Sequence, residues 1–292
     1  MIRTSIGVMA YNEEGIIGET LASLLGQKTK EVAILEIVVV CSGCTDGTEV
    51  IVREFSAKNP SIRLISQPKR EGKASAINLF MKEAKGEVLV VAGGDTRPEE
   101  NAIEELVKPF LEAKVGMTGG HPVPVNDART IMGFAAHLLW GLHHELALKH
   151  PKLGELIAFR NVTGPIPAET AVDELSIEAE LKSKGYELRY CPAAVVHNRA
   201  PLTVRDFLKQ RRRIYCGHLW VVKTKNYAAS SMSGTRIIGL VLKNMKWTPK
   251  EILYTKITVL LEVLGRLLGM WDYYIAKKNP VVWERIDSTK KL

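Results

Sequence analysis

Short β-branched runs alternate with amphipathic helical stretches over the first 91 residues, and no other feature of this sequence restricts its fold as strongly. Strands are predicted at Thr4–Met9, Glu36–Val40, Arg63–Ser66 and Val88–Ala92. Apolar residues at three- and four-residue spacing predict helices at Glu14–Leu25, Thr48–Lys58 and Lys73–Ala84. Because strands that alternate with helices build a parallel sheet from βαβ units, we predict an α/β fold in which residues 1–98 form half of a doubly wound sheet.

The remainder of the chain changes in composition twice. The region from about Val115 to Asn198 is richer in Gly, Pro and His, and it ends in a strand-like run from Ala194 to His197. From Pro201 onward the sequence is basic and mostly helical in pattern. We therefore predict one large domain over residues 1–220, with residues 99–220 as its second half, and a helical tail over residues 221–292.

The positive charge of the chain is concentrated in its last third. Residues 201–292 hold 18 Lys and Arg against 6 Asp and Glu, whereas residues 1–200 hold 22 against 26. A basic tail on an acidic body indicates an anionic partner, either phospholipid or nucleic acid. We expect no nucleic acid, because no sheet motif interleaves aromatic residues with basic ones as nucleic-acid-binding sheets do.

Cysteine usage and hydropathy bear on the compartment. The four cysteines are few and unevenly spaced, which argues against a secreted disulfide framework and for a reducing compartment. No apolar signal region follows Met1, and the charge-free apolar runs fall short of the roughly 20 residues needed to cross a bilayer. We expect a cytoplasmic protein without a transmembrane helix.

A polar loop follows each predicted strand of the first half. The loops are Ala10-Tyr11-Asn12-Glu13-Glu14, Cys41-Ser42-Gly43-Cys44-Thr45-Asp46-Gly47-Thr48, Arg70-Glu71-Gly72-Lys73 and Gly93-Gly94-Asp95-Thr96-Arg97-Pro98. Ligands of open α/β sheets bind beyond the carboxyl ends of the strands, so these loops form the expected binding edge. An alternative role for Asn12 is to cap the helix that follows it.

These four loops, followed by Asp173-Glu174 and by Gln210 and Arg213, resemble the motifs of the family-two glycosyltransferases over residues 2–220. The resemblance implies the GT-A fold, which is a Rossmann-like, doubly wound mixed sheet. It also implies an inverting enzyme that moves a sugar from a nucleotide-sugar donor to an acceptor. Members of the family include dolichol-phosphate mannose, cellulose and hyaluronan synthases, so the implied acceptor is a carbohydrate or a lipid-linked molecule.

The resemblance also implies where the donor binds. The first loop, Ala10, Tyr11, Asn12 and Glu13, resembles the family's first nucleotide-contacting loop, where a helix N-terminus offers N–H groups to phosphate. Ser42 and Asp46 fall in the loop that lines the base and ribose pocket. Lys73 matches a lysine near the donor diphosphate, and Gly94 lies in the position of the family's metal motif.

A divalent metal ion is implied at the fourth loop. Gly93-Gly94-Asp95 occupies the place of the family's D-x-D motif and keeps only its last carboxylate, Asp95. Mg²⁺ or Mn²⁺ prefers oxygen ligands and is held by one or two carboxylates together with substrate phosphates. His197, at the end of a predicted strand, is the candidate second ligand, and its alternative role is a structural histidine bonded to backbone.

The predicted catalytic base is one of two adjacent carboxylates. Asp173-Glu174 resembles the family's acidic pair in reversed order, and the spacing to Gly185-Tyr186 puts Glu174 at the position of the base. A shift of one residue would assign the role to Asp173. A carboxylate is required there to take the proton of the acceptor as its oxygen attacks the anomeric carbon.

The motif Gln210-Arg211-Arg212-Arg213-Ile214 is similar to the family's Q-x-x-R-W. Gln210 and Arg213 match, and the resemblance places them beside the acceptor and the diphosphate, where a guanidinium suits phosphate oxygens. Ile214 stands where the family has Trp, so stacking on a sugar and processive extension are not predicted.

A long amphipathic helix is predicted from Thr248-Pro249-Lys250-Glu251, a capping box with Pro at the first helical position. Its apolar side carries Leu253, Ile257, Leu260, Leu261, Leu264, Leu268, Trp271 and Ile275. Its polar side carries Glu251, Thr255, Thr258, Glu262, Arg266 and Asp272. The apolar side either covers the catalytic domain or lies in a membrane interface, and we favour peripheral association with the inner face of the cell membrane.

Three other functions are consistent with parts of this pattern. A polyprenyl-phosphate acceptor would already be ionised and would need little base catalysis. A nucleotidyltransferase also uses a doubly wound sheet, but the loop after the first strand lacks the Gly-rich, basic signature of that class. A non-catalytic protein that binds nucleotide and membrane is the third alternative.

Overall fold

The computed structural model describes residues 1–245, 247–278, 281–282 and 286–290. Its strands are β1 (Ile2–Ala10), β2 (Val32–Ser42), β3 (Ile62–Gln67), β4 (Val88–Gly93), β5 (Arg97–Pro98), β6 (Val115–Pro124), β7 (Ile157–Arg160) and β8 (Glu187–Asn198). Its α-helices are α1 (Ile17–Leu25), α2 (Thr48–Lys58), α3 (Lys73–Glu83), α4 (Ala102–Val107), α5 (Ile131–Lys149), α6 (Asp173–Ser183), α7 (Val204–Lys225), α8 (Gly234–Asn244) and α9 (Pro249–Met270). Shorter helical turns are η1 (Lys108–Leu111), η2 (Ser230–Met232), the π-helical turn η3 (Trp271–Ile275) and η4 (Asp287–Thr289).

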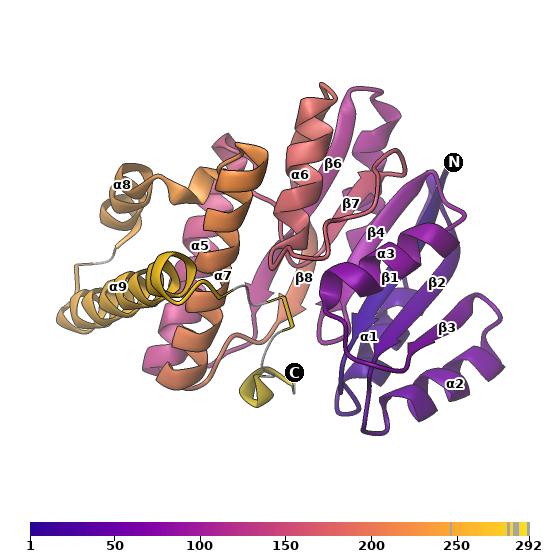
Figure 1. Ribbon diagram of the computed structural model, residues 1–292, viewed down its shortest axis with the longest axis horizontal. Helices are drawn as coiled ribbons and strands as arrows, with labels where there is room; N and C mark the ends of the chain where they lie inside the picture. The colour runs from indigo at the N-terminus through magenta and orange to yellow at the C-terminus, as the bar shows by residue number, and fades with distance from the viewer. Residues whose placement is uncertain (246, 279–280, 283–285, 291–292) are drawn as a thin grey trace.

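One mixed sheet runs through the centre of the protein in the order β3-β2-β1-β4-β7-β6-β8-β5 (Figure 1). β1 to β4 are parallel, so their carboxyl ends lie at one edge. β7 runs antiparallel to both β4 and β6, and it joins the N-terminal half of the sheet to the pair β6 and β8. The predicted doubly wound mixed sheet is confirmed.

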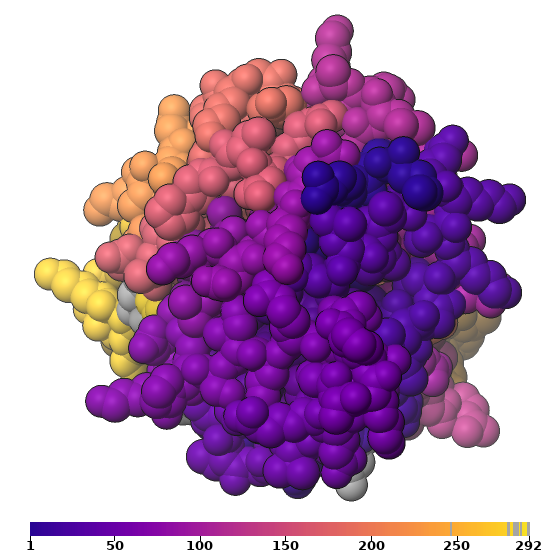
Figure 2. Space-filling view, turned by 90° about the vertical axis from the view of Figure 1, so that its right-hand side faces the viewer, coloured from indigo at the N-terminus to yellow at the C-terminus, as the bar shows by residue number. Residues whose placement is uncertain are grey.

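Helices cover both faces of the sheet, and this explains the unbroken apolar strands. Val88, Val90 and Ala92 of β4 pack in a cluster with residues of α1, α2 and α4, while Leu89 and Val91 pack in a second cluster with residues of α3 and α6. A strand buried on both faces needs apolar residues at every position. Figure 2 shows the surface of this half, in which the N-terminal part of the chain fills the face and the C-terminal tail appears only at its far edge.

The helices of the first half begin close to their predicted positions. α2 begins and ends where the sequence predicts, and α3 ends one residue early. α1 begins at Ile17 rather than Glu14, and Asn12 does not cap it, because the Asn12 side chain bonds to the next loop instead. The alternative role of Asn12 as a helix cap is therefore wrong.

α5 and α7 stand between the sheet and the last two helices, α8 and α9 (Figure 1). Threonine hydroxyls cap three of these helices: Thr130 Oγ1 accepts from the Gly133 N–H at 3.0 Å, and Thr203 and Thr248 act in the same way on α7 and α9. The predicted start of a helix at Thr248-Pro249 is thus confirmed. α7 passes through residue 220 without a break, and the division of the chain there stays a prediction.

α9 is turned so that its polar side faces the protein. Thr255, Thr258, Gly265 and Gly269 are its buried residues, and Glu262 forms an ion pair with Arg211 of α7 at 3.5 Å. Leu260 and Leu267 on the other side are 67% and 56% exposed. The alternative in which the apolar side of α9 covers the catalytic domain is wrong.

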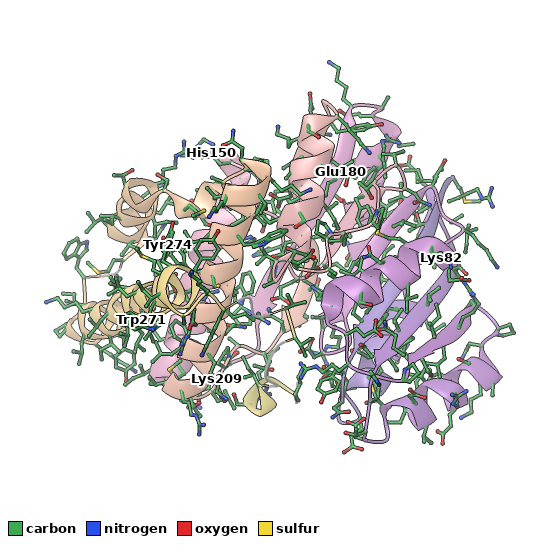
Figure 3. The ribbon with its side chains drawn as sticks, in the orientation of Figure 1. Lys82, His150, Glu180, Lys209, Trp271 and Tyr274 are labelled. Atoms are coloured by element: carbon green, nitrogen blue, oxygen red, sulfur yellow. The ribbon has the colours of Figure 1, made fainter. Side chains whose placement is uncertain are left out.

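The apolar side of α9 continues into η3, where Trp271 and Tyr274 are 59% and 57% exposed (Figure 3). On the polar side, Asp272 accepts two hydrogen bonds from the Arg212 guanidinium and so joins η3 to α7. Within the described residues, no helix has both the length and the hydropathy to cross a bilayer.

Candidate active site

The loops after β1 and β2 are tied together at the carboxyl edge of the sheet. Asn12, with a left-handed backbone (φ 54°), donates from Nδ2 to Thr45 Oγ1 at 3.0 Å and accepts at Oδ1 from the Thr45 N–H at 2.7 Å. The Glu13 N–H donates to Thr48 Oγ1 at 2.7 Å. Asp46 accepts from the Thr48 N–H at 3.0 Å and so holds the start of α2. The two loops form one connected floor.

Tyr11 and Ser42 contact the third loop. The Arg70 guanidinium lies over the Tyr11 ring, 3.8 Å from its centroid, and Ser42 Oγ accepts from the Glu71 N–H at 3.4 Å. Both contacts hold the segment that precedes α3 against the floor, so three of the four loops meet.

The fourth loop approaches the first one closely because Gly94 has no side chain. Its N–H donates to the Met9 carbonyl at 3.0 Å. A Cβ on Gly94 would come within 3.2 Å of Ala10 Cβ and of Glu13 Cγ. Glycine therefore brings Asp95 next to Glu13.

Lys73 connects these loops to the acidic pair Asp173 and Glu174. It begins α3 directly after Gly72, whose φ of 95° favours glycine. Its Nζ lies 3.0 Å from Asp173 Oδ2, and the Asp173 side chain is only 2% exposed. Burial opposes the charge of Lys73, but the carboxylates of Asp173 and Glu174 outweigh it and raise the pKa of Lys73.

Asp95 and Glu13 hold a cation between them. The Lys290 ammonium lies 2.5 Å from Glu13 Oε1 and 2.9 Å from Asp95 Oδ2. Burial would raise the pKa of Asp95, yet the contact with Lys290 outweighs it and keeps that pKa below its usual value. The position occupied by this ammonium group is therefore favourable for positive charge.

A divalent metal ion fits this position with the help of substrate oxygens. Asp95 and Glu13 are hard oxygen ligands, as Mg²⁺ and Mn²⁺ prefer. No group of three or more His, Cys, Asp and Glu side chains suited to a metal occurs among the residues that the structure describes. The protein would thus supply at most these two carboxylates, and phosphate oxygens or water would complete the coordination.

A cavity of about 270 Å³ opens beside Asp95 and extends between α5 and α7. Glu174 lines it, whereas Asp173 is occupied by Lys73. Burial, followed by the charge of Asp173, raises the pKa of Glu174. Of the two candidate bases, only Glu174 is presented to this cavity.

Glu155 and Lys152 line the same cavity on the loop before β7. Glu155 has a left-handed backbone (φ 51°), and burial together with the charge of Asp95 raises its pKa to about 7. Burial lowers the pKa of Lys152, against the nearby charges of Glu174 and Glu178. The site thus contains acids and bases whose pKa values are shifted in opposite directions, a pattern common at active sites.

α7 contributes Gln210 and Arg213. Gln210 lines the cavity. Burial lowers the pKa of Arg213 to about 10, although Glu174 and Asp173 act to raise it. Ile214 takes the place of the family's Trp, and the next residue, Tyr215, also lines the cavity.

His197 lies apart from the other candidate residues. Its Nε2 is 3.1 Å from Glu99 Oε1, and it lines a separate shallow pocket with Arg97 and Ser23. The structure therefore brings Asp95 together with Glu13, Lys73 and Glu174, but it does not bring His197 to Asp95.

Three residues of the site were missed from the sequence. Glu155 and Lys152 reach the carboxyl edge because β7 runs antiparallel to β4, with Val91 opposite Ile157, and the order of strands is needed to see this. Lys290 is 195 residues from Asp95 in sequence and carries no local signal. A glycine and an acidic residue just before an apolar run, as at Gly154-Glu155-Leu156-Ile157, form the one pattern that could have indicated Glu155.

Comparison with known families gives two overlapping matches. Residues 5–168 match the family described as Glycosyl transferase family 2, and residues 89–275 match Glycosyl transferase family group 2. Together these matches include every loop of the site except the C-terminal segment with Lys290.

Curated relatives are similar over part of their length. The chain is 26% identical over 236 residues to Probable glycosyltransferase YdaM of Bacillus subtilis (strain 168), covering 75% of this chain and 56% of that protein. It is 30% identical over 142 residues to Dolichyl-phosphate beta-glucosyltransferase ALG5C of Trichomonas vaginalis, covering 47% and 40%. It is 24% identical over 217 residues to Poly-beta-1,6-N-acetyl-D-glucosamine synthase of Staphylococcus epidermidis, covering 70% and 51%. The chain spans about half the length of these relatives.

Solved structures share the fold. The mannosyltransferase PcManGT of Pyrobaculum calidifontis, in complex with GDP-Man and Mn²⁺, superposes with a TM-score of 0.66 at 20% identity and covers 93% of this chain and 88% of its own. Glucosyl-3-phosphoglycerate synthase of Mycobacterium tuberculosis, in complex with Mn²⁺, UDP and phosphoglyceric acid, gives 0.52 at 19% identity, with 75% and 78% covered. The GT-A fold expected from the sequence is confirmed.

Proposed function

Because the chain belongs to glycosyl transferase family 2, we propose that it moves a sugar from a nucleoside-diphosphate donor to an acceptor at a membrane surface. One observation carries this proposal: Asp95 and Glu174 line one cavity at the carboxyl edge of the sheet. Glu13 shares the Lys290 ammonium group with Asp95, and Lys73 pairs with Asp173, the neighbour of Glu174. The complexes of its structural neighbours with GDP-Man or UDP and Mn²⁺ support a nucleotide-sugar donor.

The donor would bind on the floor formed by the first two loops. Ser42 and Asp46 would line the space for base and ribose, and Tyr11 and Asn12 would contact the nucleotide from the first loop, as the family resemblance implies. The diphosphate would lie between Lys73 and Asp95, and a bound Mg²⁺ or Mn²⁺ would neutralise the charge that develops on it as the sugar leaves. Arg213 would supply further donors to phosphate oxygens.

Glu174 would act as the general base. The acceptor oxygen attacks the anomeric carbon, its proton passes to the Glu174 carboxylate, and the bond from that carbon to the diphosphate oxygen breaks. The nucleoside diphosphate leaves with the bonding electrons, and the configuration at the anomeric carbon inverts. Lys73 would hold Asp173 and thereby the start of α6, so that Glu174 points into the cavity.

Peripheral membrane association would occur through α8 and α9. Leu253, Leu260 and Leu267 present an apolar side that no described element covers, and Lys250 and Lys256 are exposed nearby. Apolar side chains flanked by lysines favour the interface of an anionic bilayer. This arrangement supports an acceptor that is itself lipid-linked, at the inner face of the cell membrane.

A thermal-shift panel tests the donor and the metal. UDP, GDP, CMP and ADP are each added with and without Mn²⁺ to the wild type, to Asp95→Asn and to a control, Glu100→Gln, that removes one exposed surface charge. A ligand at a hundred times its dissociation constant stabilises by about 2.7 kcal/mol. We expect one diphosphate to stabilise wild type and Glu100→Gln only with Mn²⁺, and Asp95→Asn to lose this effect. The proposal fails if no nucleotide stabilises the wild type.

A polyprenyl-phosphate acceptor is a second candidate, favoured by Lys152 and Arg211, two cations that line the cavity near Glu174. A phosphate acceptor carries no proton that Glu174 must remove. We therefore expect Glu174→Gln to reduce the rate of nucleoside-diphosphate release by about 10²- to 10⁴-fold for a hydroxyl acceptor, and by much less than Asp95→Asn for a phosphate acceptor. Nucleotide binding without release in the wild type would instead indicate a binding protein.

A further inference from the structure

The cavity at the active site has a second end, away from the sheet. Asp95 and Glu174 line it on the sheet side of α5 and α7, and Ile237 of α8 lines it on the other side. Figure 1 shows that α5 and α7 stand between these two groups of elements. The cavity is therefore a passage between the two helices rather than a pocket confined to the catalytic carboxylates.

The side of α5 that faces the passage is mostly apolar. Met132, Ala136, Leu139, Trp140 and Leu146 follow one another along it at helical spacing and line the cavity. Ile214 of α7 faces them. A wall of aliphatic side chains suits a hydrocarbon chain better than it suits a sugar, which needs hydrogen-bond partners along its length.

Polar groups line the passage near Glu174 and also beside α9, which contributes Glu262 and Arg266. Lys152 lies close enough to Glu174 and Glu178 for both carboxylates to raise its pKa against the effect of burial. His143, which also lines the cavity, is 7% exposed and lies beside Lys152. Buried polar groups need hydrogen-bond partners, so this end of the passage, with Lys152 and His143, is suited to a polar head group.

The far end of the passage meets an exposed apolar surface. Ile237 lines the passage, while its neighbour Ile238 is 61% exposed and Leu242, one turn further along α8, is 54% exposed. Trp247, in the link to α9, is 70% exposed. The same helix thus borders the passage and the surface that would rest on a bilayer.

We infer that the passage between α5 and α7 binds the hydrocarbon chain of a lipid-linked acceptor, which enters from the bilayer beneath α8 and brings its polar head group to Glu174 and Lys152. This inference rests on the proposed function, because it names the acceptor class of the same site. Its basis is the continuity of the cavity from Asp95 and Glu174 to α8 and the apolar side that α5 presents along it.

Quenching of Trp140 fluorescence tests the inference. The probes are alkyl phosphates of four to ten carbons that carry bromine at the chain end, used below their critical micelle concentrations. Bromine quenches tryptophan by contact, and the part of the quenching that Trp140→Phe removes reports on the passage. We expect the affinity for the protein to rise by about fourfold for each added methylene, as burial of a CH₂ group predicts.

Two variants of α5 provide the matched comparison. Ala136→Leu adds a side chain inside the passage, since Ala136 is 4% exposed and lines it. Gly141→Leu adds the same side chain on the outer side, where a Cβ meets nothing within 4 Å. We expect Ala136→Leu to weaken decyl phosphate binding at least tenfold and Gly141→Leu to leave it unchanged. Both variants should keep the Mn²⁺-dependent stabilisation by nucleotide.

The outcomes separate this inference from the proposed function. It is overturned if the wild type binds nucleotide with Mn²⁺ but butyl and decyl phosphate bind equally, or if both α5 variants bind decyl phosphate alike. Loss of nucleotide stabilisation in Ala136→Leu would indicate misfolding, and Leu139→Phe, which fills the passage with less change in shape, then replaces it. Absence of nucleotide binding in the wild type would count against the proposed function alone.

Discussion

Glu155 lines the cavity of the candidate active site, and its carboxyl group is easier to protonate than usual. Burial and the charge of Asp95 raise its pKa from 4.5 to about 7. The folded state therefore binds a proton more tightly than the unfolded state, and the free energy of unfolding falls as the pH rises from about 4.5 to about 7. Above neutral pH, the buried charge of Glu155 therefore lowers the free energy of unfolding.

Substitution of Glu155 by Gln should remove this cost. We expect Glu155→Gln to be more stable than the wild type at pH 8 by about 2 to 3 kcal/mol and nearly equal to it at pH 5. Urea unfolding at the two pH values measures the difference. Glu54→Gln, on the exposed side of α2, is the control and should shift both values equally. An equal stabilisation of Glu155→Gln at both pH values would contradict the prediction.

Lys290 occupies the position where a metal ion would bind, between Glu13 and Asp95. A divalent ion must displace its ammonium group, because two cations cannot share two carboxylates at this distance. We expect Lys290→Ala to bind Mn²⁺ about tenfold more tightly than the wild type in the absence of nucleotide, a change of about 1.4 kcal/mol. Titration calorimetry with MnCl₂ measures it.

The control for this prediction is Lys256→Ala, which removes an exposed cation of α9 far from the site in sequence. It should leave the Mn²⁺ affinity unchanged. If Lys290→Ala binds Mn²⁺ no better than Lys256→Ala does, the ammonium group does not compete with the ion.

At the scale of the elements, α7 and α9 approach closely because α9 carries glycines at the contact. A Cβ on Gly265 would lie 2.6 Å from Arg211 Cβ, and one on Gly269 would lie 2.7 Å from the Arg212 carbonyl oxygen. The close approach allows the side chains of Glu262 and Asp272 to reach the arginines of α7. The glycines and acidic residues on the polar side of α9 and η3 therefore match the shape and the arginines of α7.

Gly265→Ala should separate the two helices. We expect it to lower the free energy of unfolding by about 1 to 3 kcal/mol, the usual effect of an added group in a packed contact. Gly239→Ala on α8, where a Cβ meets nothing within 4 Å, should be neutral or stabilising by up to about 1 kcal/mol. Urea unfolding of the two variants compares them. Equal free energies of unfolding would show that the contact between α7 and α9 can accommodate a methyl group at position 265.

The sequence predicts local elements well and their arrangement less well. Periodicity locates β1 to β4 and α1 to α3, because each is fixed by its own apolar pattern and by the loop that follows it. It also identifies α9, but not which side of α9 faces the protein, since this depends on the arginines of α7. Glu155 and Lys152 reach the site because β7 pairs with β4, and Lys290 reaches it because the C-terminal segment folds back onto the first half. Neither long-range contact can be predicted from the neighbouring residues in sequence.

At the scale of the whole molecule, exposed apolar side chains are most concentrated on α8, α9 and η3. We expect the wild type to sediment with vesicles that contain phosphatidylglycerol, and less so with phosphatidylcholine alone or at high salt. The double variant Leu260→Glu, Leu267→Glu should remain in the supernatant and keep its melting temperature, because both side chains are exposed.

The matched control places the same charges on apolar residues of the opposite half. Val50 and Leu111 are 60% and 62% exposed, so Val50→Glu, Leu111→Glu should sediment as the wild type does. Equal loss of sedimentation in both double variants would show that net charge, and not the side of α9, governs the association.

With the proposed membrane association, the outward apolar side of α9 would also determine which concentration the enzyme responds to. A catalyst seated on a bilayer by this side meets its acceptor by diffusion in two dimensions, so its turnover follows the mole fraction of acceptor among the lipids rather than the amount in the whole solution. Adding inert lipid at constant total acceptor would then slow the reaction, although nothing had been removed. For such an enzyme the composition of the membrane acts as a control on rate.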